Sequence, residues 1–289
     1  MKKRFISIGL GLAIIFILYN AISTNKAKGF IWEASKDKKS IYLIGTLHPG
    51  KSGVNYENKT LNKIMNETEA LAVEVDVTDK NNEKEVVKDA KEKMYLKEGE
   101  IKDLLSNKEK EKFDKILKEL DINYGDVKNL TPSGFSDVVN AMIANEANME
   151  TLGTEGFLIN NYKSKGKVVI ELENHKIQSM VLESDEKDLK SFVNNFESKD
   201  VLFKNSTNHF NNIVDAYIKG DETYFLETEA IGETEINKER NINMADKIDK
   251  LAKENKRYAA AIGTYHFFGK HSILKNLENK GYSIKRLEC

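Results

Sequence analysis

Two histidines follow the same short pattern at opposite ends of the sequence. His48 closes the segment Gly-Thr-Leu-His and His266 closes the segment Gly-Thr-Tyr-His, and each segment directly follows a mostly apolar run. An imidazole at the end of such a run is a candidate metal ligand or general base. The recurrence of the pattern predicts that the two histidines serve one site.

Acidic residues accompany the apolar runs between these histidines. Glu74 lies inside the run 70–77, and Glu171 and Glu173 lie at the end of the run that begins at residue 168. A buried carboxylate is costly unless it is paired or binds a metal. Strand alternation predicts that Glu171 and Glu173 share one face of their strand. Imidazoles and carboxylates together suit Zn, Mn, Fe or Co, and such an ion with an open position activates water.

Ordinary structural roles stay open for the same residues. A histidine at a strand end often serves only as a hydrogen-bonding partner, and Glu74 has an alternative role in an ion pair with a lysine. The chain has no short ligand motif such as His-Glu-x-x-His that would fix a metal from spacing alone.

Strands and helices alternate along most of the chain. The runs 30–34 and 41–44 flank a polar turn and predict a hairpin, and a helix is expected over 57–69. Buried strands are expected over 70–77 and 168–172, and the last third repeats the rhythm of strand, helix and strand. This order predicts an α/β fold with a central, largely parallel sheet flanked by helices. Ligands bind beyond the carboxyl ends of strands in such sheets, where both histidines fall.

Residues 79–150 differ from the rest in being rich in Lys and Glu with helical apolar spacing. Ser106 and Glu109 form a capping-box pattern ahead of apolar residues at 113, 116, 117 and 120. We interpret residues 79–150 as a helical insert or lid within a single α/β domain that spans 30–289.

The N-terminus has the layout of an export signal. Three basic residues at positions 2–4 precede an uncharged, mostly apolar run over 5–22. This pattern predicts a signal peptide or N-terminal membrane anchor over 1–23 and a protein that is exported, either anchored on the outer face of the membrane or secreted.

Composition narrows the possible chemistry. The formal net charge is −1, which gives no support to nucleic-acid binding. The single cysteine, Cys289, excludes an internal disulfide, so a metal would be held by histidines and carboxylates.

A series of segments in order resembles the TraB/PrgY/GumN family, which also contains the Tiki metalloproteases. The chain matches seven elements of the family in order: the opening Trp, the first Gly-x-x-His, the glutamate strand, the Leu-Glu segment, the Gly-Asp element, the Arg-Asn helix and the second Gly-x-x-His. The matching segments are WEASKDKKSIYLIGTLHPG, LAVEVDV, GTEGFLINNYKSKGKVVIELENHKIQ, YIKGDETYF, ERNINMADKI and AAAIGTYHFFG. Two positions depart from the pattern: Glu155 stands where the family has Asp, and Asn174 where it has Thr.

The resemblance implies a fold related to the ChaN-like and erythromycin-esterase-like α/β proteins. For the Tiki branch it implies metal-dependent peptide cleavage that relies on the residues carried here by His48, Glu74 and His266. Arg240 falls at the family's Arg, where it would bind a peptide carboxylate or stabilise an oxyanion. A buried ion pair with Glu173 or Glu74 is its alternative role.

Two classes of function follow. The first is an exported, metal-dependent hydrolase of peptides, in which His48, Glu74 and His266 hold Mn, Co or Zn and Arg240 steadies developing charge. Glu173 or Glu74 would then be the general base. The second is a non-enzymatic surface protein that sequesters a peptide signal such as a peptide pheromone. A metal-free, esterase-like hydrolase with His48 as general base is a lower alternative.

Overall fold

The computed structural model describes residues 26–76, 78–79, 88, 93–150, 152–174, 176–177, 184–229 and 233–288. The predicted signal peptide or anchor over 1–23 lies outside the described residues, as does Cys289. Within the described ranges, no helix combines the length and the apolar character that crossing a membrane requires.

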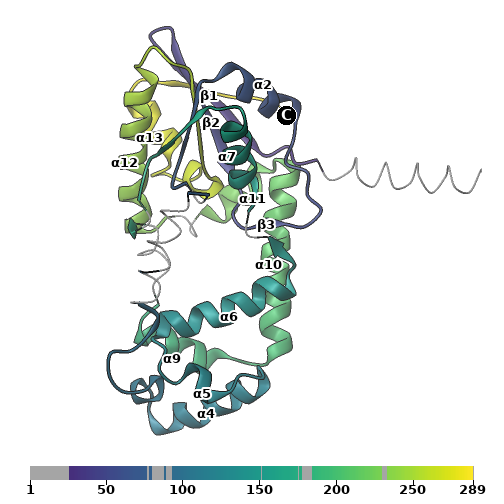
Figure 1. Ribbon diagram of the computed structural model, residues 1–289, viewed down its shortest axis with the longest axis vertical. Helices are drawn as coiled ribbons and strands as arrows, with labels where there is room; N and C mark the ends of the chain where they lie inside the picture. Colours follow the sequence, from purple (N-terminus) through teal and green to yellow (C-terminus); the bar gives the residue numbers. More distant parts are fainter. Residues whose placement is uncertain are drawn as a thin grey trace, which may run out of the picture.

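A mixed, mostly parallel sheet of six strands forms the centre of the larger part of the molecule (Figure 1). Its order is β6-β4-β7-β2-β1-β8. The strands are β1 (Phe30–Lys36), β2 (Lys39–Thr46), β4 (Ala70–Val73), β6 (Val168–Glu171), β7 (Tyr258–Gly263) and β8 (Ser283–Arg286). Strands β2, β7, β4 and β6 run parallel, whereas β1 is antiparallel to both β2 and β8. The predicted α/β class is confirmed.

The predicted hairpin is also confirmed as β1 and β2. Lys36 pairs with Lys39 across a turn in which Asp37 and Lys38 have φ values of 50° and 64°. Two successive residues with positive φ are typical of the tight turn whose twist matches that of the flanking strands.

Helices cover both faces of the sheet. Helices α2 (Lys59–Glu67) and α7 (Thr154–Ser164) pack their apolar residues on one face. The other face is covered by α10 (Lys199–Lys219), α11 (Glu222–Glu227), α12 (Glu235–Ala252) and α13 (Ile273–Asn279). The central strand β7 carries three successive alanines that are 0% exposed, so its small side chains let helices approach from both sides.

The smaller, helical part has a hydrophobic cluster of its own. It contains η1 (Ile101–Leu104), α4 (Asn107–Glu119), α5 (Tyr124–Val127), α6 (Pro132–Glu146) and α9 (Glu186–Asn195). The capping box at Ser106 and Glu109 is confirmed at the start of α4. Because α9 and the first turns of α10 also join this cluster, the helical part extends beyond the predicted insert over 79–150. The division into one domain with an insert stays a prediction.

Two strands are shorter than predicted, and this changes the position of their glutamates. Strand β4 ends at Val73 and β6 ends at Glu171, so Glu74 and Glu173 lie just beyond strand ends. The expectation that Glu171 and Glu173 share a strand face was wrong, since Glu171 is exposed whereas Glu173 is 7% exposed. Glu173, beyond the strand end, pairs with the buried Arg240. A short two-stranded ribbon, β3 (Gly50–Lys51) with β5 (Met149–Glu150), lies outside the main sheet.

Candidate active site

The candidate site residues lie at one edge of the sheet. His48 follows β2, Glu74 follows β4, Glu173 follows β6, and His266 lies in η3 (Thr264–Phe267) directly after β7. These four strands are parallel, so their carboxyl ends meet at the same edge. A cavity of about 390 Å³ opens there. Its polar lining includes His48, Glu74, His266, Arg240 and Glu155.

The two Gly-Thr-x-His segments lie side by side, as the sequence pattern predicted. Thr46 pairs with Gly263 across the parallel strands, and the hydroxyl of Thr264 donates a 2.8 Å hydrogen bond to the carbonyl of Thr46. A Cβ on Gly45 would lie only 3.0 Å from Thr264 Oγ1, so the glycine permits this close contact. The repeated motif therefore joins two strand ends into one site.

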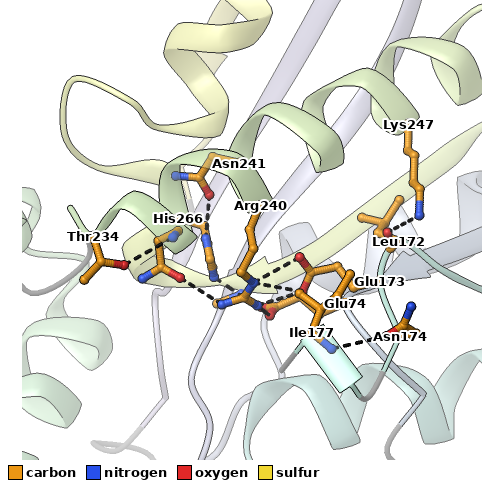
Figure 2. Close-up of polar contacts among 12 residues, drawn as sticks. Glu74, Leu172, Glu173, Asn174, Ile177, Thr234, Arg240, Asn241, Lys247 and His266 are labelled. Atoms are coloured by element: carbon orange, nitrogen blue, oxygen red, sulfur yellow. Dashed lines mark hydrogen bonds and ion pairs between the residues drawn. The ribbon is translucent and has the colours of Figure 1, made fainter. Parts of the chain in front are cut away.

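Arg240 is held between two buried carboxylates (Figure 2). Its Nη2 donates to Glu74 Oε2 and to Glu173 Oε2, each at 2.7 Å, and its Nε donates to Glu173 Oε1 at 3.0 Å. Its Nη1 donates to Asn237 Oδ1 at 2.9 Å. The structure thus forms the ion pair that the sequence left as the alternative role, and it does so with both glutamates at once.

Glu74 links the arginine to the second histidine segment. Its Oε2 accepts from Arg240, while its Oε1 accepts the backbone N–H of Gly263 at 2.7 Å. A Cβ on Gly263 would lie 3.2 Å from Glu74 Oε1, so the glycine leaves room for the carboxylate. Glu74 is 9% exposed and lines the cavity.

The hydrogen bonds of Asn241 define the tautomer of His266. Its Nδ2 donates to the carbonyl of His271 at 3.0 Å, which turns its Oδ1 toward His266 Nδ1, at 2.6 Å. An amide oxygen only accepts, so His266 Nδ1 carries the proton and Nε2 keeps a free lone pair. This Nε2 lies 3.8 Å from Glu74 Oε2. Burial lowers the pKa of His266 more than the charge of Glu74 raises it, so the ring is neutral at pH 7.

His48 is the more open of the two histidines. Its side chain is exposed and lines the cavity, where neighbouring protein atoms remove part of its hydration and lower its pKa. The charge of Glu74 acts in the opposite direction on the same pKa. Both histidines are therefore available as neutral bases or metal ligands.

Glu155 is a site residue to which sequence reasoning gave no role. It lies in the first turn of α7, is 6% exposed, and its Oε1 has no hydrogen-bond partner among the described residues. Burial, and then the charges of Glu74 and Asp76, raise the pKa of Glu155 well above its ordinary value. The start of α7 reaches the site because Gly153 permits close packing against Leu47 and the N–H of Thr154 donates to the Leu47 carbonyl at 3.1 Å.

Asn241 was likewise given no role from the sequence, although it adjoins Arg240 in the Arg-Asn segment. The sequence signal that could have pointed to Glu155 is a carboxylate directly after Gly-Thr, ahead of the apolar residues Phe157, Leu158 and Ile159. Two other histidines are described and do not line the cavity. His209 is exposed on α10, His271 precedes α13, and His175 lies outside the described residues.

The site residues match a divalent cation in donor type. His266 Nε2 and Glu74 Oε2 face each other, and His48 lines the same cavity. The orphaned buried oxygen of Glu155 is a further acceptor on the cavity wall. Among the described residues, however, no three His, Cys, Asp or Glu side chains already form a metal-binding group.

Fold and site together define an α/β protein with a histidine–carboxylate site at the carboxyl edge of a mostly parallel sheet. The sequence model of the TraB/PrgY/gumN family matches residues 30–286. The chain belongs to the TraB/PrgY/gumN family, and the resemblance seen in its motifs is confirmed. No curated protein and no solved structure matches it.

Proposed function

We propose that this protein is a metal-dependent hydrolase that cleaves peptides. The observation that carries the proposal is the convergence of two neutral histidines, Glu74 and Arg240 on one cavity that also has an apolar wall. Its volume of about 390 Å³ falls in the range of small-ligand sites. The N-terminal segment 1–23 would deliver the protein to or across the membrane, so its proposed substrates are extracellular peptides.

Charge balance supports a cation at this site. The carboxylates of Glu74 and Glu173 outnumber the single guanidinium of Arg240, while His266 is neutral. The hydrogen bond from His266 Nδ1 to Asn241 is the arrangement that orients metal-ligating histidines, since the second ring nitrogen is left for the ion. Glu74 accepts with both oxygens, from Arg240 and from the backbone of Gly263, so its carboxylate is held in place at the cavity.

His48, Glu74 and His266 would hold the ion, and Mn²⁺, Co²⁺ or Zn²⁺ suits these donors. A divalent ion bound there would supply a water molecule of lowered pKa. Arg240 lines the cavity, so its positive charge would stabilise negative charge that develops on a substrate carbonyl.

The two candidate general bases differ in their access to the cavity. The side chain of Glu173 is 2% exposed, both its oxygens accept from Arg240, and it does not line the cavity. Glu74 does line the cavity. We therefore assign to Glu173 the role of holding Arg240 and retain Glu74 as the candidate base.

Metal titration of the full chain, purified in detergent, tests the proposal. Mn²⁺, Co²⁺ and Zn²⁺ are titrated into the wild type, His48→Ala and His266→Ala, with His209→Ala as a matched control on the exposed face of α10. We expect binding to be lost in the two site variants and kept in the control. Digestion of a peptide library, read by mass spectrometry, then shows whether metal-loaded protein generates new termini.

Retention of both metal binding and cleavage by His48→Ala and His266→Ala would contradict the proposal. The second candidate is a protein that binds and sequesters a peptide without cleaving it, a function that needs the cavity and Arg240 but no metal. That protein would return every peptide intact after incubation.

A further inference from the structure

One side of the cavity is apolar. Phe210 and Ile213 reach it from α10, Phe225 from α11, and Leu47 from the loop after β2. The ionisable lining residues described above come from the sheet edge, α7 and α12. A substrate group that enters the cavity therefore meets both ionisable and apolar side chains.

Phe225, which forms the most deeply buried part of this apolar wall, is held in place by aromatic packing. Phe225 is 0% exposed, and its ring lies 5.0 Å from that of Phe30, 5.1 Å from that of Tyr265 and 5.3 Å from that of Phe268. Such a cluster holds each ring in one position because every rotation would collide with a neighbour. The Phe225 ring is thus in position before any substrate binds.

The rest of the wall comes from one face of α10. Phe210 and Ile213 are three residues apart on this helix, so their side chains cover adjacent surface. Phe210 is 6% exposed and Ile213 is half-buried. Changes at these two positions alter the size of the cavity, whereas changes at Phe225 disturb the core of the molecule.

We propose that Phe210, Ile213 and Phe225 form a pocket for one large apolar side chain of the substrate peptide, next to the bond that is cleaved. This makes Phe210 and Ile213 specificity-determining residues. The inference deepens the proposed function and rests on it for cleavage, although the binding that it predicts needs no cleavage. An acidic side chain is disfavoured at this position because the side chains of Phe210, Ile213 and Phe225 offer it no hydrogen bond.

The test uses fluorescein-labelled heptapeptides of Gly and Ser with one central Leu, Phe, Ala or Asp. Binding is measured by anisotropy, and cleavage by mass spectrometry, on the full chain in detergent. We expect the Leu and Phe peptides to bind about 10- to 200-fold more tightly than the Asp peptide. Their kcat/KM for cleavage should be higher than that of the Asp peptide by a similar factor. Ile213→Trp fills the pocket and removes most of this preference.

Ile242→Trp is the matched control, because Ile242 is an isoleucine on α12 that is 41% exposed and does not line the cavity. It should keep the wild-type preference. Equal binding of the Leu and Asp peptides by the wild type, or a preference that survives Ile213→Trp, would overturn the pocket. A preference for Leu in binding, lost in Ile213→Trp, without cleavage of any peptide would support the pocket and refute the proposed hydrolase.

Discussion

The sheet edge and the helical part differ in what they bury. Buried charged side chains gather at the sheet edge, where Glu74, Glu155, Glu173 and Arg240 are all below 10% exposed. In the described residues of the helical part, from 93 to 146 and from 184 to 205, the buried side chains are apolar and the ionisable ones lie at the surface. Burying charge costs free energy, whereas burying apolar surface supplies it. The buried side chains of the helical part therefore stabilise the fold, whereas the buried charges at the sheet edge cost free energy, as expected at the proposed site.

The largest effect should come from removing the one guanidinium at the sheet edge. Arg240→Leu leaves Glu74 and Glu173 buried without their shared cation, which costs about 3–5 kcal/mol of unfolding free energy. Lys190→Leu is the matched change in the helical part, where Lys190 forms an exposed, solvent-screened pair with Glu186 and the loss of stability should be small. Urea unfolding measures the stability of both variants. Equal losses of stability in Arg240→Leu and Lys190→Leu would contradict the difference drawn between the sheet edge and the helical part.

A second effect should appear in binding and catalysis. Asn241→Leu removes the acceptor that fixes His266, so metal affinity and kcat/KM should fall by about 10- to 100-fold. Asn241→Asp keeps an acceptor oxygen and should restore most of the loss. If Leu and Asp behave alike in metal titration, Asn241 does not orient the histidine.

Glu155 should make stability depend on pH. The pKa of Glu155 is raised in the folded state above its ordinary value of 4.5, so the folded protein holds this proton more tightly than the unfolded chain. Its contribution to stability is therefore fully present below pH 4.5 and is lost as the pH rises through the folded-state pKa.

Glu155→Gln removes this dependence. As the pH rises from 4.5 towards the folded-state pKa, the wild type should lose about 1.4 kcal/mol of unfolding free energy per pH unit relative to the variant, because only the wild type must ionise a buried carboxyl group. Urea unfolding at several values between about pH 4.5 and 8 measures the difference. Parallel stability curves for the two proteins would show that Glu155 is not the group responsible.

The smallest effect should come from a cap in the helical part. Ser106→Ala removes the side chain that accepts the backbone N–H of Glu109, which costs about 1 kcal/mol of unfolding free energy. Metal binding and peptide cleavage should stay at wild-type values. A loss of either would show that the helical part takes part in the chemistry directly.

The outline of both fold and site was predictable from the sequence. Apolar runs that end in Gly-Thr-x-His placed His48 and His266 at strand ends, and strand–helix alternation predicted a parallel sheet that brings such ends together. Glu74 was predicted to be paired or to bind a metal, because a carboxylate inside a buried apolar run is otherwise costly. The placement of these residues at strand ends is confirmed because it depends on local pattern and on a general property of parallel sheets, whereas their roles stay predictions.

The remaining features depend on contacts between distant segments. Composition does not reveal that Arg240 pairs with Glu74 and Glu173 together, since that requires α12 to lie across two strand ends. Glu155 enters the site only because Gly153 packs against Leu47. Strands 70–77 and 168–172 were predicted too long because their apolar pattern continues past the last backbone pairing.

Helix α10 makes the cavity mechanically dependent on the rest of the molecule. Its 21 residues extend for about 30 Å, from the helical part to the sheet (Figure 1). The first residue, Lys199, donates its N–H to Glu119 of α4 at 2.7 Å, and further along Phe210 and Ile213 form part of the cavity wall. The same helix therefore packs in the helical part with its first turns and in the cavity wall with later ones, so substitutions that shift its packing on α4 should also be felt at the wall.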